Sequence, residues 1–360
     1  MKEEHTRLYI PGPTEVKREI IEAMNEWMFG HRSGTMTDLF TTITEDTKKF
    51  LGTENHVIIL SASGTAFMES TVNDLVDENV LCSTCGSFSK RQAEIAERLG
   101  KNVDRLDYEW GTAVKPEDVR AALEKKDYDA FTCVMNETST GIRNPIEEIG
   151  EVMKDFPDTM FLVDAISALG GDYIDIDKHG IEVIYTSVQK AFAMPPGLAV
   201  CVVNEDAYER SRDTKAGSFY AGLAQNIDYY KKKGQTPSTP AISLMAAYRA
   251  QMKKMLEEGH KARSQRHLEM AEYTRGWANK HFEMFPEKGY WSQTVSTIAN
   301  TRGLNIEELR QKINAEHNML FSNGYGKQLK EKTFRIGHMG EHTLETVKEL
   351  TDTIETVAGL

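Results

Sequence analysis

The sequence of 360 residues predicts an α/β protein whose larger part is a mostly parallel sheet with helices on both sides. Short apolar runs alternate with helical patterns between about residues 55 and 205, which is the rhythm of strand, helix and parallel strand. The chain is also too long for a typical single domain. We therefore expect an N-terminal arm at 1–17, a large domain at 18–265 and a smaller C-terminal α+β domain at 266–360.

The expected strands are near-continuous apolar runs, as in strands that are buried on both faces. They are 56–60, 79–83, 131–135, 159–165, 183–187 and 198–203, and helical patterns lie at 65–76, 89–100 and 116–126. Residues 213–240 are polar, contain glycine and close with two Thr-Pro steps, which predicts an extended excursion. Residues 241–285 predict one or two long helices.

Composition excludes several classes of partner. The net charge is −12 and no Lys/Arg-rich block stands out, whereas a nucleic acid or an anionic membrane attracts positive charge. No apolar run approaches the roughly 20 residues of a membrane span, and the N-terminus has no apolar signal core. These features, with only four cysteines, predict a cytoplasmic protein without a disulfide framework.

A Cys-x-x-Cys pair, Cys82 and Cys85, could be a redox pair or half of a metal site. A structural zinc site needs a second pair of ligands, and none is evident, so we expect no metal. The simpler interpretation is that both are small buried residues near the end of a strand.

Two polar residues follow expected strands at the edge where open α/β sheets bind ligands. Lys190 comes shortly after the strand that ends at Ser187, and Pro195, Pro196 and Gly197 hold it on a stiff turn. A lysine in this position can form a Schiff base, although a lone lysine is more often a surface residue. Asp164 ends another strand, where a carboxylate is costly unless it meets a cation such as a protonated pyridine. Capping a following helix is the alternative.

Three further segments carry candidate anion-binding groups. Ser63, Gly64 and Thr65 lie between a strand and a helix, as in a phosphate site, although an ordinary helix cap fits equally well. Thr138 follows a strand and could donate to a ligand or cap a helix. Arg335 lies in a strand-like run and could grip a carboxylate, where the competing interpretation is a surface salt bridge.

Taken together, the motifs resemble the class V aminotransferases of fold type I, and most of all the alanine/serine–glyoxylate (serine–pyruvate) branch. Eight pieces run in the family's order over nearly the whole chain. They are PGPTEV (11–16), GHRSG (30–34), SASGTAFMES (61–70), GSFSKRQAEIAERLG (86–100), NETSTGIRNP (136–145), VDAISALGG (163–171), VQKAFAMPPGLA (188–199) and FRIGHMG (334–340). The resemblance implies a seven-stranded sheet and pyridoxal 5'-phosphate as cofactor.

The resemblance also implies a role for each matching position. Lys190 would carry the Schiff base and Asp164 would pair with the pyridine nitrogen. The other cofactor contacts would be Phe88 on the ring, Thr138 on the ring oxygen, and Ser63, Gly64, Thr65 and Gln189 at the phosphate. Arg335 would hold the substrate α-carboxylate, with Gly12 nearby. Relatives are usually homodimers with shared sites, so His31 and Arg32 would approach the neighbour's substrate, and Thr236 and Thr239 the neighbour's phosphate.

The sequence departs from the family in two places. Val188 stands where relatives often have a hydroxyl residue, and the tyrosine that some relatives supply to the neighbour's phosphate is not evident near Gln235. Cysteine desulfurases share the fold, but they carry His where Gln189 stands and a catalytic Cys in a late loop that this chain lacks.

The expected activity is ping-pong transfer of an amino group from a small L-amino acid, alanine or serine, to a 2-oxo acid, glyoxylate or pyruvate. Lys190 would move the proton, which requires a lowered pKa. An aspartate-directed, broad-specificity or ureidoglycine–glyoxylate aminotransferase is the alternative, with Arg32 as a candidate for a second carboxylate. A non-catalytic α/β phosphate-binding protein is the remote alternative.

Overall fold

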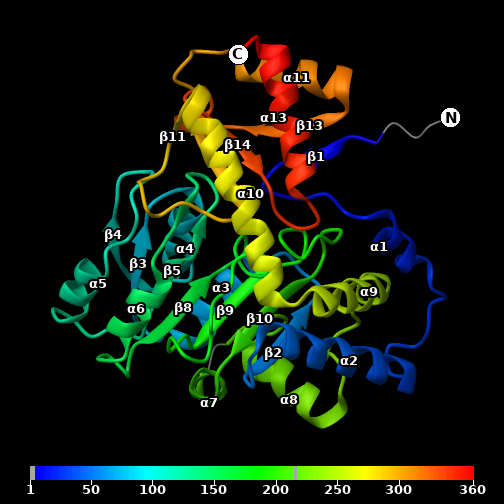
Figure 1. The fold of residues 1–360 in the computed structure, drawn as a ribbon. Coiled ribbons are helices and arrows are strands. Elements are labelled where there is room, and N and C mark those ends of the chain that lie inside the picture. The colour runs from blue at the N-terminus through cyan, green and yellow to red at the C-terminus, as the bar shows by residue number, and fades with distance from the viewer. Residues whose placement is uncertain (1–4, 215–216) are drawn as a thin grey trace.

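The computed structural model describes residues 5–214 and 217–360, and its largest element is a seven-stranded sheet (Figure 1). In order across the sheet, the strands are β2 (His56–Leu60), β10 (Ala199–Val203), β9 (Val183–Ser187), β8 (Met160–Asp164), β5 (Ala130–Val134), β3 (Asn79–Thr84) and β4 (Asn102–Asp107). Strand β10 pairs antiparallel with both of its neighbours, and the other pairings are parallel. The predicted mostly parallel sheet is confirmed.

The sequence did not predict β4, which lies at the edge of this sheet. Its residues, Asn-Val-Asp-Arg-Leu-Asp, are half-exposed or exposed, because an edge strand is not covered on all sides. It therefore lacks the apolar run by which the six buried strands were recognised.

Helices cover both faces of the large sheet and bury its side chains in two clusters. Since successive strand residues point to opposite faces, Val57 and Ile59 join one cluster while Ile58 and Leu60 join the other. One face is covered by α2 (Gly34–Leu51), α5 (Pro116–Leu123), α6 (Ile146–Met153) and α9 (Ile242–Glu258), and the other by α3 (Thr65–Leu75), α4 (Ser87–Arg98), α7 (Glu205–Asp213) and α8 (Leu223–Lys233).

The chain's excursion at 213–240 is not purely extended, as the sequence predicted, because it contains helix α8. Leu223 and Ile227, four residues apart, bury one side of α8, and Gly234 ends the helix in the left-handed conformation. This spacing is a helix signal that the polar composition of the segment obscured. The predicted long helices at 241–285 are confirmed as α9 and α10 (His260–His281).

A second, five-stranded sheet forms above the first in Figure 1. Its strands, in order, are β1 (Arg7–Tyr9), β13 (Met319–Asn323), β14 (Thr333–Gly337), β12 (Val295–Ala299) and β11 (Glu283–Met284). It packs with α11 (Ile306–His317), α12 (Gly326–Leu329) and α13 (Leu344–Ala358), and an aromatic core surrounds Phe334.

The N-terminal segment and α10 connect the two sheets. Strand β1 pairs with β13 in the small sheet, after which the chain crosses to α1 (Arg18–Glu22) and η1 (Ala23–Asn25) beside the large one. Helix α10 runs from the lower sheet to the upper one in Figure 1. The boundary predicted at residue 265 falls inside this helix, and the division into domains stays a prediction. A short hairpin of β6 (Asn136–Glu137) and β7 (Ile142–Arg143) completes the described strands.

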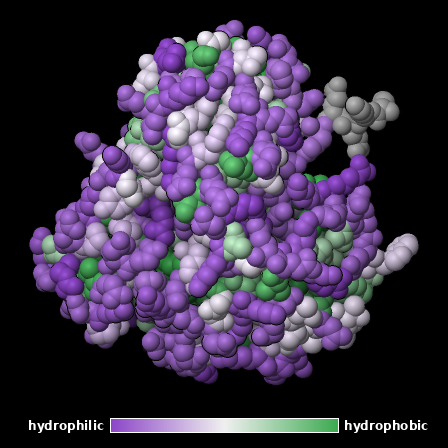
Figure 2. All heavy atoms as spheres, in the orientation of Figure 1, coloured by the Kyte–Doolittle hydropathy of each residue, from purple (hydrophilic) through white to green (hydrophobic). Residues whose placement is uncertain are grey.

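All four cysteines are free and buried, with Cys82 inside β3 and Cys85 just after it, as predicted for small residues at a strand end. None of the described helices is long and apolar enough to cross a membrane. The face drawn in Figure 2 is mostly hydrophilic.

Candidate active site

A cavity of about 170 Å³ lies where the large sheet's strands end, and it gathers eight predicted residues. They are Ser63, Gly64, Thr65, Phe88, Thr138, Asp164, Gln189 and Lys190. These residues follow β2, β3, β5, β8 and β9, whose carboxyl ends lie at one edge of the sheet. The sequence therefore placed these side chains together correctly.

Lys190 lies on the cavity wall in a turn that follows β9. Its backbone N–H donates to Ser187 O at 3.2 Å, and its Nζ donates to Pro11 O at 2.6 Å. Burial lowers the pKa of Lys190 to about 8, Arg335 acts in the same direction, and Asp164 opposes both. An amine with this pKa has a substantial neutral fraction near pH 8, as a nucleophile or proton acceptor requires.

The N-terminal segment packs directly on this lysine. Gly12 has φ +125°, and a Cβ at this position would lie 2.6 Å from Nζ of Lys190. Two residues later, Thr14 N donates to Gln189 O at 2.9 Å. Gly12, predicted near the substrate, is therefore the residue that leaves room for the lysine side chain.

Asp164 is 3% exposed, and its Oδ1 accepts a hydrogen bond from Ile166 N at 2.8 Å. Burial raises the pKa of Asp164 to about 7, although the Ile166 amide and Lys190 act in the opposite direction. A turn follows Asp164 rather than a helix, so the alternative interpretation as a helix cap is wrong. A buried acid of this kind is stabilised by any cation that enters the cavity.

Helix α3 presents its N-terminus to the cavity. Its N-cap residue is Gly64, so no side chain caps the first turn, and Gly64 N donates to Ser187 Oγ at 3.2 Å. Ser187 Oγ donates in turn to Gln189 Oε1 at 2.6 Å. A Cβ at Gly64 would lie 2.6 Å from Ile166 Cδ1, so a larger residue here would displace the Ile166 side chain that lines the cavity. A helix N-terminus directed at a cavity favours an anion there, because the helix dipole is positive at this end.

The hairpin after β5 holds a buried network of hydroxyl and amide groups. Thr138 Oγ1 lies 2.7 Å from Ser167 Oγ, to which Asn136 Nδ2 also donates at 2.7 Å. Glu137 accepts from Phe88 N at 3.0 Å and from Ser89 N at 2.8 Å, so it caps α4 and fixes the start of that helix. Thr138 bonds to Ser167 rather than capping a helix.

Arg335 lies in β14 and is 8% exposed. Nη1 donates to Thr138 O and Nε to Asn323 O, both at 3.2 Å. No carboxylate forms an ion pair with Arg335 among residues 5–214 and 217–360, and burial lowers its pKa to about 10. The competing interpretation as a surface salt bridge is therefore wrong. Arg335 is a buried cation that forms no ion pair with a described side chain, although the negative charge of Glu137 favours it.

Four predicted residues, His31, Arg32, Thr236 and Thr239, do not line this cavity, and two of them, Arg32 and Thr236, contact each other. Arg32 Nη1 donates to Thr236 O at 2.5 Å, and its Nη2 donates to Pro237 O at 2.6 Å. Thr236 Oγ1 donates to Ser238 O at 2.7 Å, Thr239 is exposed, and His31 is half-buried. The resemblance assigns Arg32, His31, Thr236 and Thr239 to a neighbour's site, and these roles stay predictions.

Sequence reasoning missed three polar residues that line the cavity: Arg91, Asn136 and Ser167. Arg91 follows Phe88 by three residues on α4, and its Cζ lies 4.9 Å from the centre of the Phe88 ring. Helical spacing could have found it, because residues three apart share a helix face. Asn136 comes after β5, as Thr138 does, and Ser167 comes after β8, which ends at Asp164. Because strand ends carry many polar residues, this position alone could not have singled them out.

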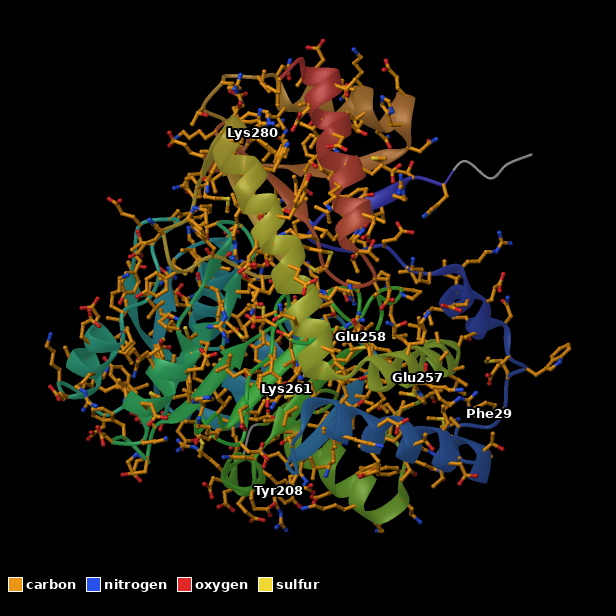
Figure 3. The ribbon with its side chains drawn as sticks, in the orientation of Figure 1. Phe29, Tyr208, Glu257, Glu258, Lys261 and Lys280 are labelled. Atoms are coloured by element: carbon orange, nitrogen blue, oxygen red, sulfur yellow. The ribbon has the colours of Figure 1, made fainter. Side chains whose placement is uncertain are left out.

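A second set of charges supports the Lys190 turn from behind. Arg263 on α10 is 1% exposed and donates to Ala191 O at 2.8 Å and to Gly170 O at 3.1 Å. It pairs with Glu258 at 2.7 Å and with Glu341 at 2.9 Å. Figure 3 labels Glu258 where α9 passes into α10. This arginine joins α10, the Lys190 turn and the loop after β14.

The cavity's groups fit the cofactor that the resemblance implies. Pyridoxal 5'-phosphate needs an amine for its aldehyde, an acid for its ring nitrogen and donors for its phosphate. Lys190, Asp164 and the N-terminus of α3 with Ser63 and Thr65 all border this cavity and supply these groups. Buried Oδ1 of Asn136 also has no hydrogen-bond partner in the part of the chain that the structure describes.

Comparison with known proteins gives consistent results. Residues 8–282 match the family model described as "Aminotransferase class-V". An uncharacterized aminotransferase from Methanocaldococcus jannaschii is 40% identical, covering 92% of this chain and 87% of the relative. The serine–glyoxylate aminotransferase of Methylorubrum extorquens is 30% identical over 93% of this chain and 86% of the relative. The crystal structure of alanine–glyoxylate aminotransferase from Nostoc sp. superimposes with a TM-score of 0.92 at 29% identity, covering 98% and 95% of the two chains.

Sequence, fold and cavity therefore agree. The fold is that of the fold type I aminotransferases, with the predicted seven-stranded sheet, and the matched family uses pyridoxal 5'-phosphate. The chain belongs to the class V aminotransferases, and it is a pyridoxal-phosphate-dependent enzyme related to the serine– and alanine–glyoxylate aminotransferases.

Proposed function

We propose that the enzyme moves the amino group of a small L-amino acid, alanine or serine, to glyoxylate or pyruvate. The observation that carries this proposal is that Lys190 and Asp164 line one cavity while Arg335 adjoins it without a compensating acid. The names of the serine–glyoxylate and alanine–glyoxylate relatives support this pair of substrates.

The cavity residues divide the work by chemistry. Bound pyridoxal 5'-phosphate supplies an aldehyde that links to amines and a ring that accepts electrons from the substrate's α-carbon. Nζ of Lys190 would hold the cofactor through its aldehyde and, as a free amine, would accept the proton from the substrate's α-carbon. Asp164 would favour a proton on the ring nitrogen, and its own cost of burial as an anion would fall with that cation beside it.

The other residues bind and orient. The N-terminus of α3, with the hydroxyls of Ser63 and Thr65 and the amide of Gln189, would hold the phosphate. Phe88 would stack on the ring and Thr138 would contact its oxygen. Arg335 would take the α-carboxylate of both donor and acceptor, since a buried guanidinium without an acid partner favours an anionic ligand.

Exposed aromatic side chains support the proposed homodimer. Trp27 is 95% exposed and Phe219 is 83% exposed, which is unusual for side chains of this size. Trp27 lies close in sequence to Arg32, and Phe219 lies in the same segment, 213–240, as Thr236; Arg32 and Thr236 are expected to reach the neighbour's site. A shared interface would cover these rings and bring both segments to the second active site.

Transfer from aspartate, or by an enzyme of broad specificity, is the second candidate function. It needs a further cation for the second carboxylate, and Arg91 on the cavity wall forms no ion pair within the described residues. Arg32, the cation first considered for this role, bonds to backbone carbonyls away from the cavity of its own chain. A ureidoglycine donor is the other alternative.

A donor–acceptor screen of the purified holoenzyme tests the proposal. Alanine, serine, aspartate and other amino acids are paired with glyoxylate, pyruvate and 2-oxoglutarate, and Lys190→Ala is the control. Alanine or serine with glyoxylate or pyruvate should give the highest kcat/KM. A clear preference for aspartate would support the second candidate instead, and absence of a lysine-dependent visible absorption band would contradict both.

A further inference from the structure

Tyr325 joins the carboxylate-binding arginine to the wall of the cavity. It lies in the segment between β13 and α12, beside the small sheet. Its ring centre is 5.2 Å from Cζ of Arg335 and also 5.2 Å from the centre of the Phe88 ring, at an interplanar angle of 50°. Phe88 lines the cavity, so Tyr325 is in contact with both the cavity wall and the cation.

Arg335 needs such a partner because its hydrogen bonds do not fix it completely. Nε and Nη1 each donate to a backbone carbonyl at 3.2 Å, and Nη2 donates to no side chain or backbone group in the described part of the chain. A guanidinium that lies over an aromatic face is held in its plane, which leaves its edge available for two parallel hydrogen bonds to a carboxylate.

The Tyr325 hydroxyl makes no hydrogen bond to the described residues that would account for the position of the ring. Within residues 5–214 and 217–360, no hydrogen bond to the Tyr325 hydroxyl is present, and the side chain is half-buried. The ring itself therefore makes the interactions, with the guanidinium on one side and Phe88 on another. The cavity wall and the clamp come from different sheets, so Tyr325 couples their positions.

We propose that Tyr325 is a positioning residue that holds the guanidinium of Arg335 in the orientation that grips the substrate α-carboxylate. The proposal rests on the proposed role of Arg335. Every donor and acceptor carries this carboxylate. Loss of the Tyr325 ring should therefore weaken the binding of each of them by the same factor, whatever its side chain.

The test uses the holoenzyme with Tyr325→Leu, Tyr325→Gln and Tyr325→Phe. The two variants without the ring should raise KM for donor and acceptor about fivefold and change kcat less than about twofold, while Tyr325→Phe stays near wild type. Acetate, a carboxylate that cannot react, serves as the binding probe, and its Kd is read from the change it causes in the visible absorption. That Kd should rise by the same factor.

Tyr273→Leu is the matched control. Tyr273 also lies beneath a cation, with Lys348 Nζ 5.7 Å from its ring centre, but this pair joins α10 and α13 and does not border the cavity. This variant should leave the acetate Kd and both KM values unchanged.

The outcomes separate this inference from the proposed function. If Arg335→Gln weakens acetate but neither ring-free variant does, the role of Tyr325 is wrong and the clamp stands. If Arg335→Gln itself leaves acetate binding unchanged, the clamp assignment fails. Effects that differ strongly between alanine and serine would also overturn the inference, because they would mean that Tyr325 contacts the donor's side chain.

Discussion

Two buried arginines in this enzyme have opposite surroundings. Arg263, behind the Lys190 turn, pairs with Glu258 and Glu341 and donates to two backbone carbonyls. Arg335, beside the cavity, donates to two backbone carbonyls and pairs with no acid within the described residues. Both are at least 92% buried, since their exposed fractions are 1% and 8%.

The difference separates charges that hold the structure from charges that are kept for a ligand. A buried charge is costly unless it is paired and hydrogen-bonded. Burial acts to raise the pKa of Glu341, but Arg263, Gln251 and Arg266 together hold it below its ordinary value, so the carboxylate stays ionised. At the cavity the reverse holds: burial lowers the pKa of Lys190 and raises that of Asp164, which disfavours both charges. The uncompensated groups surround the cavity, as expected for a binding site.

The largest expected effect belongs to the cavity. Lys190→Ala should lower kcat by at least about a thousandfold, because the cofactor tether and the proton acceptor are lost together. Stopped assays with alanine and glyoxylate measure the loss, and unchanged circular dichroism shows that the fold persists. A variant that retains a tenth of the activity would remove Lys190 from its proposed role.

Arg263→Gln should act on stability instead. Removing Arg263 leaves the buried Glu341 without its ion-pair partner, whereas Glu258 keeps its pair with Arg266. The loss should cost about 3–5 kcal/mol of unfolding free energy. Urea denaturation of the holoenzyme measures this change, and the double variant with Glu341→Gln should recover part of it. If Arg263→Gln unfolds at the wild-type urea concentration, Arg263 does not stabilise the fold as its ion pairs predict.

Arg335→Gln should give the opposite pattern. The KM for alanine and for glyoxylate should rise about 10- to 100-fold, equivalent to about 1.4–2.7 kcal/mol, because a charge-assisted contact to the carboxylate is lost. The stability should change little or rise, since the variant removes an unpaired buried charge. Steady-state kinetics and thermal unfolding decide this together, and a large fall in Tm with unchanged KM would reverse the assignment.

The smallest expected effect is the dependence of stability on pH that Asp164 causes. Its folded-state pKa of about 7 lies above the ordinary 3.8, so the folded state binds the proton more tightly than the unfolded state does. The resulting stability is present below pH 3.8 and is lost as the pH rises through 7. Between pH 5.5 and 8, the cofactor-free wild type should therefore lose about 2 kcal/mol of unfolding free energy through Asp164. Asp164→Asn should not show this loss.

Thermal unfolding of the cofactor-free protein at the two pH values measures this difference, which should appear as a few degrees in Tm. Lys190 acts at higher pH, because its lowered pKa destabilises the folded state as the pH falls from 10.5 towards 8 and changes the stability little below that. Lys190→Met at the same two pH values is therefore the matched control. Identical pH profiles for wild type and Asp164→Asn would show that Asp164 is not held at a raised pKa.

Much of the fold was predictable because buried strands have a strong local signal. The run Val183–Ser187 was predicted with its observed bounds, since apolar residues on both faces leave one interpretation. Edge strand β4 and helix α8 were missed, because both are partly exposed and carry many polar residues. Each of these elements buries only one side, so whether it forms depends on the residues that pack against that side.

The sequence by itself determined the fold class and the residues at the strand ends, Asp164 and Lys190 among them, because hydrophobic periodicity and strand-end position are local properties of the chain. Only the tertiary structure decided which charges are compensated. Arg263 and Arg335 look alike in the sequence, and Tyr325 has no motif of its own. Besides partners nearby in the chain, their roles depend on contacts with residues at least 70 positions away, namely Ala191 for Arg263, Thr138 for Arg335 and Phe88 for Tyr325. These distant contacts exist only when the two sheets are packed together.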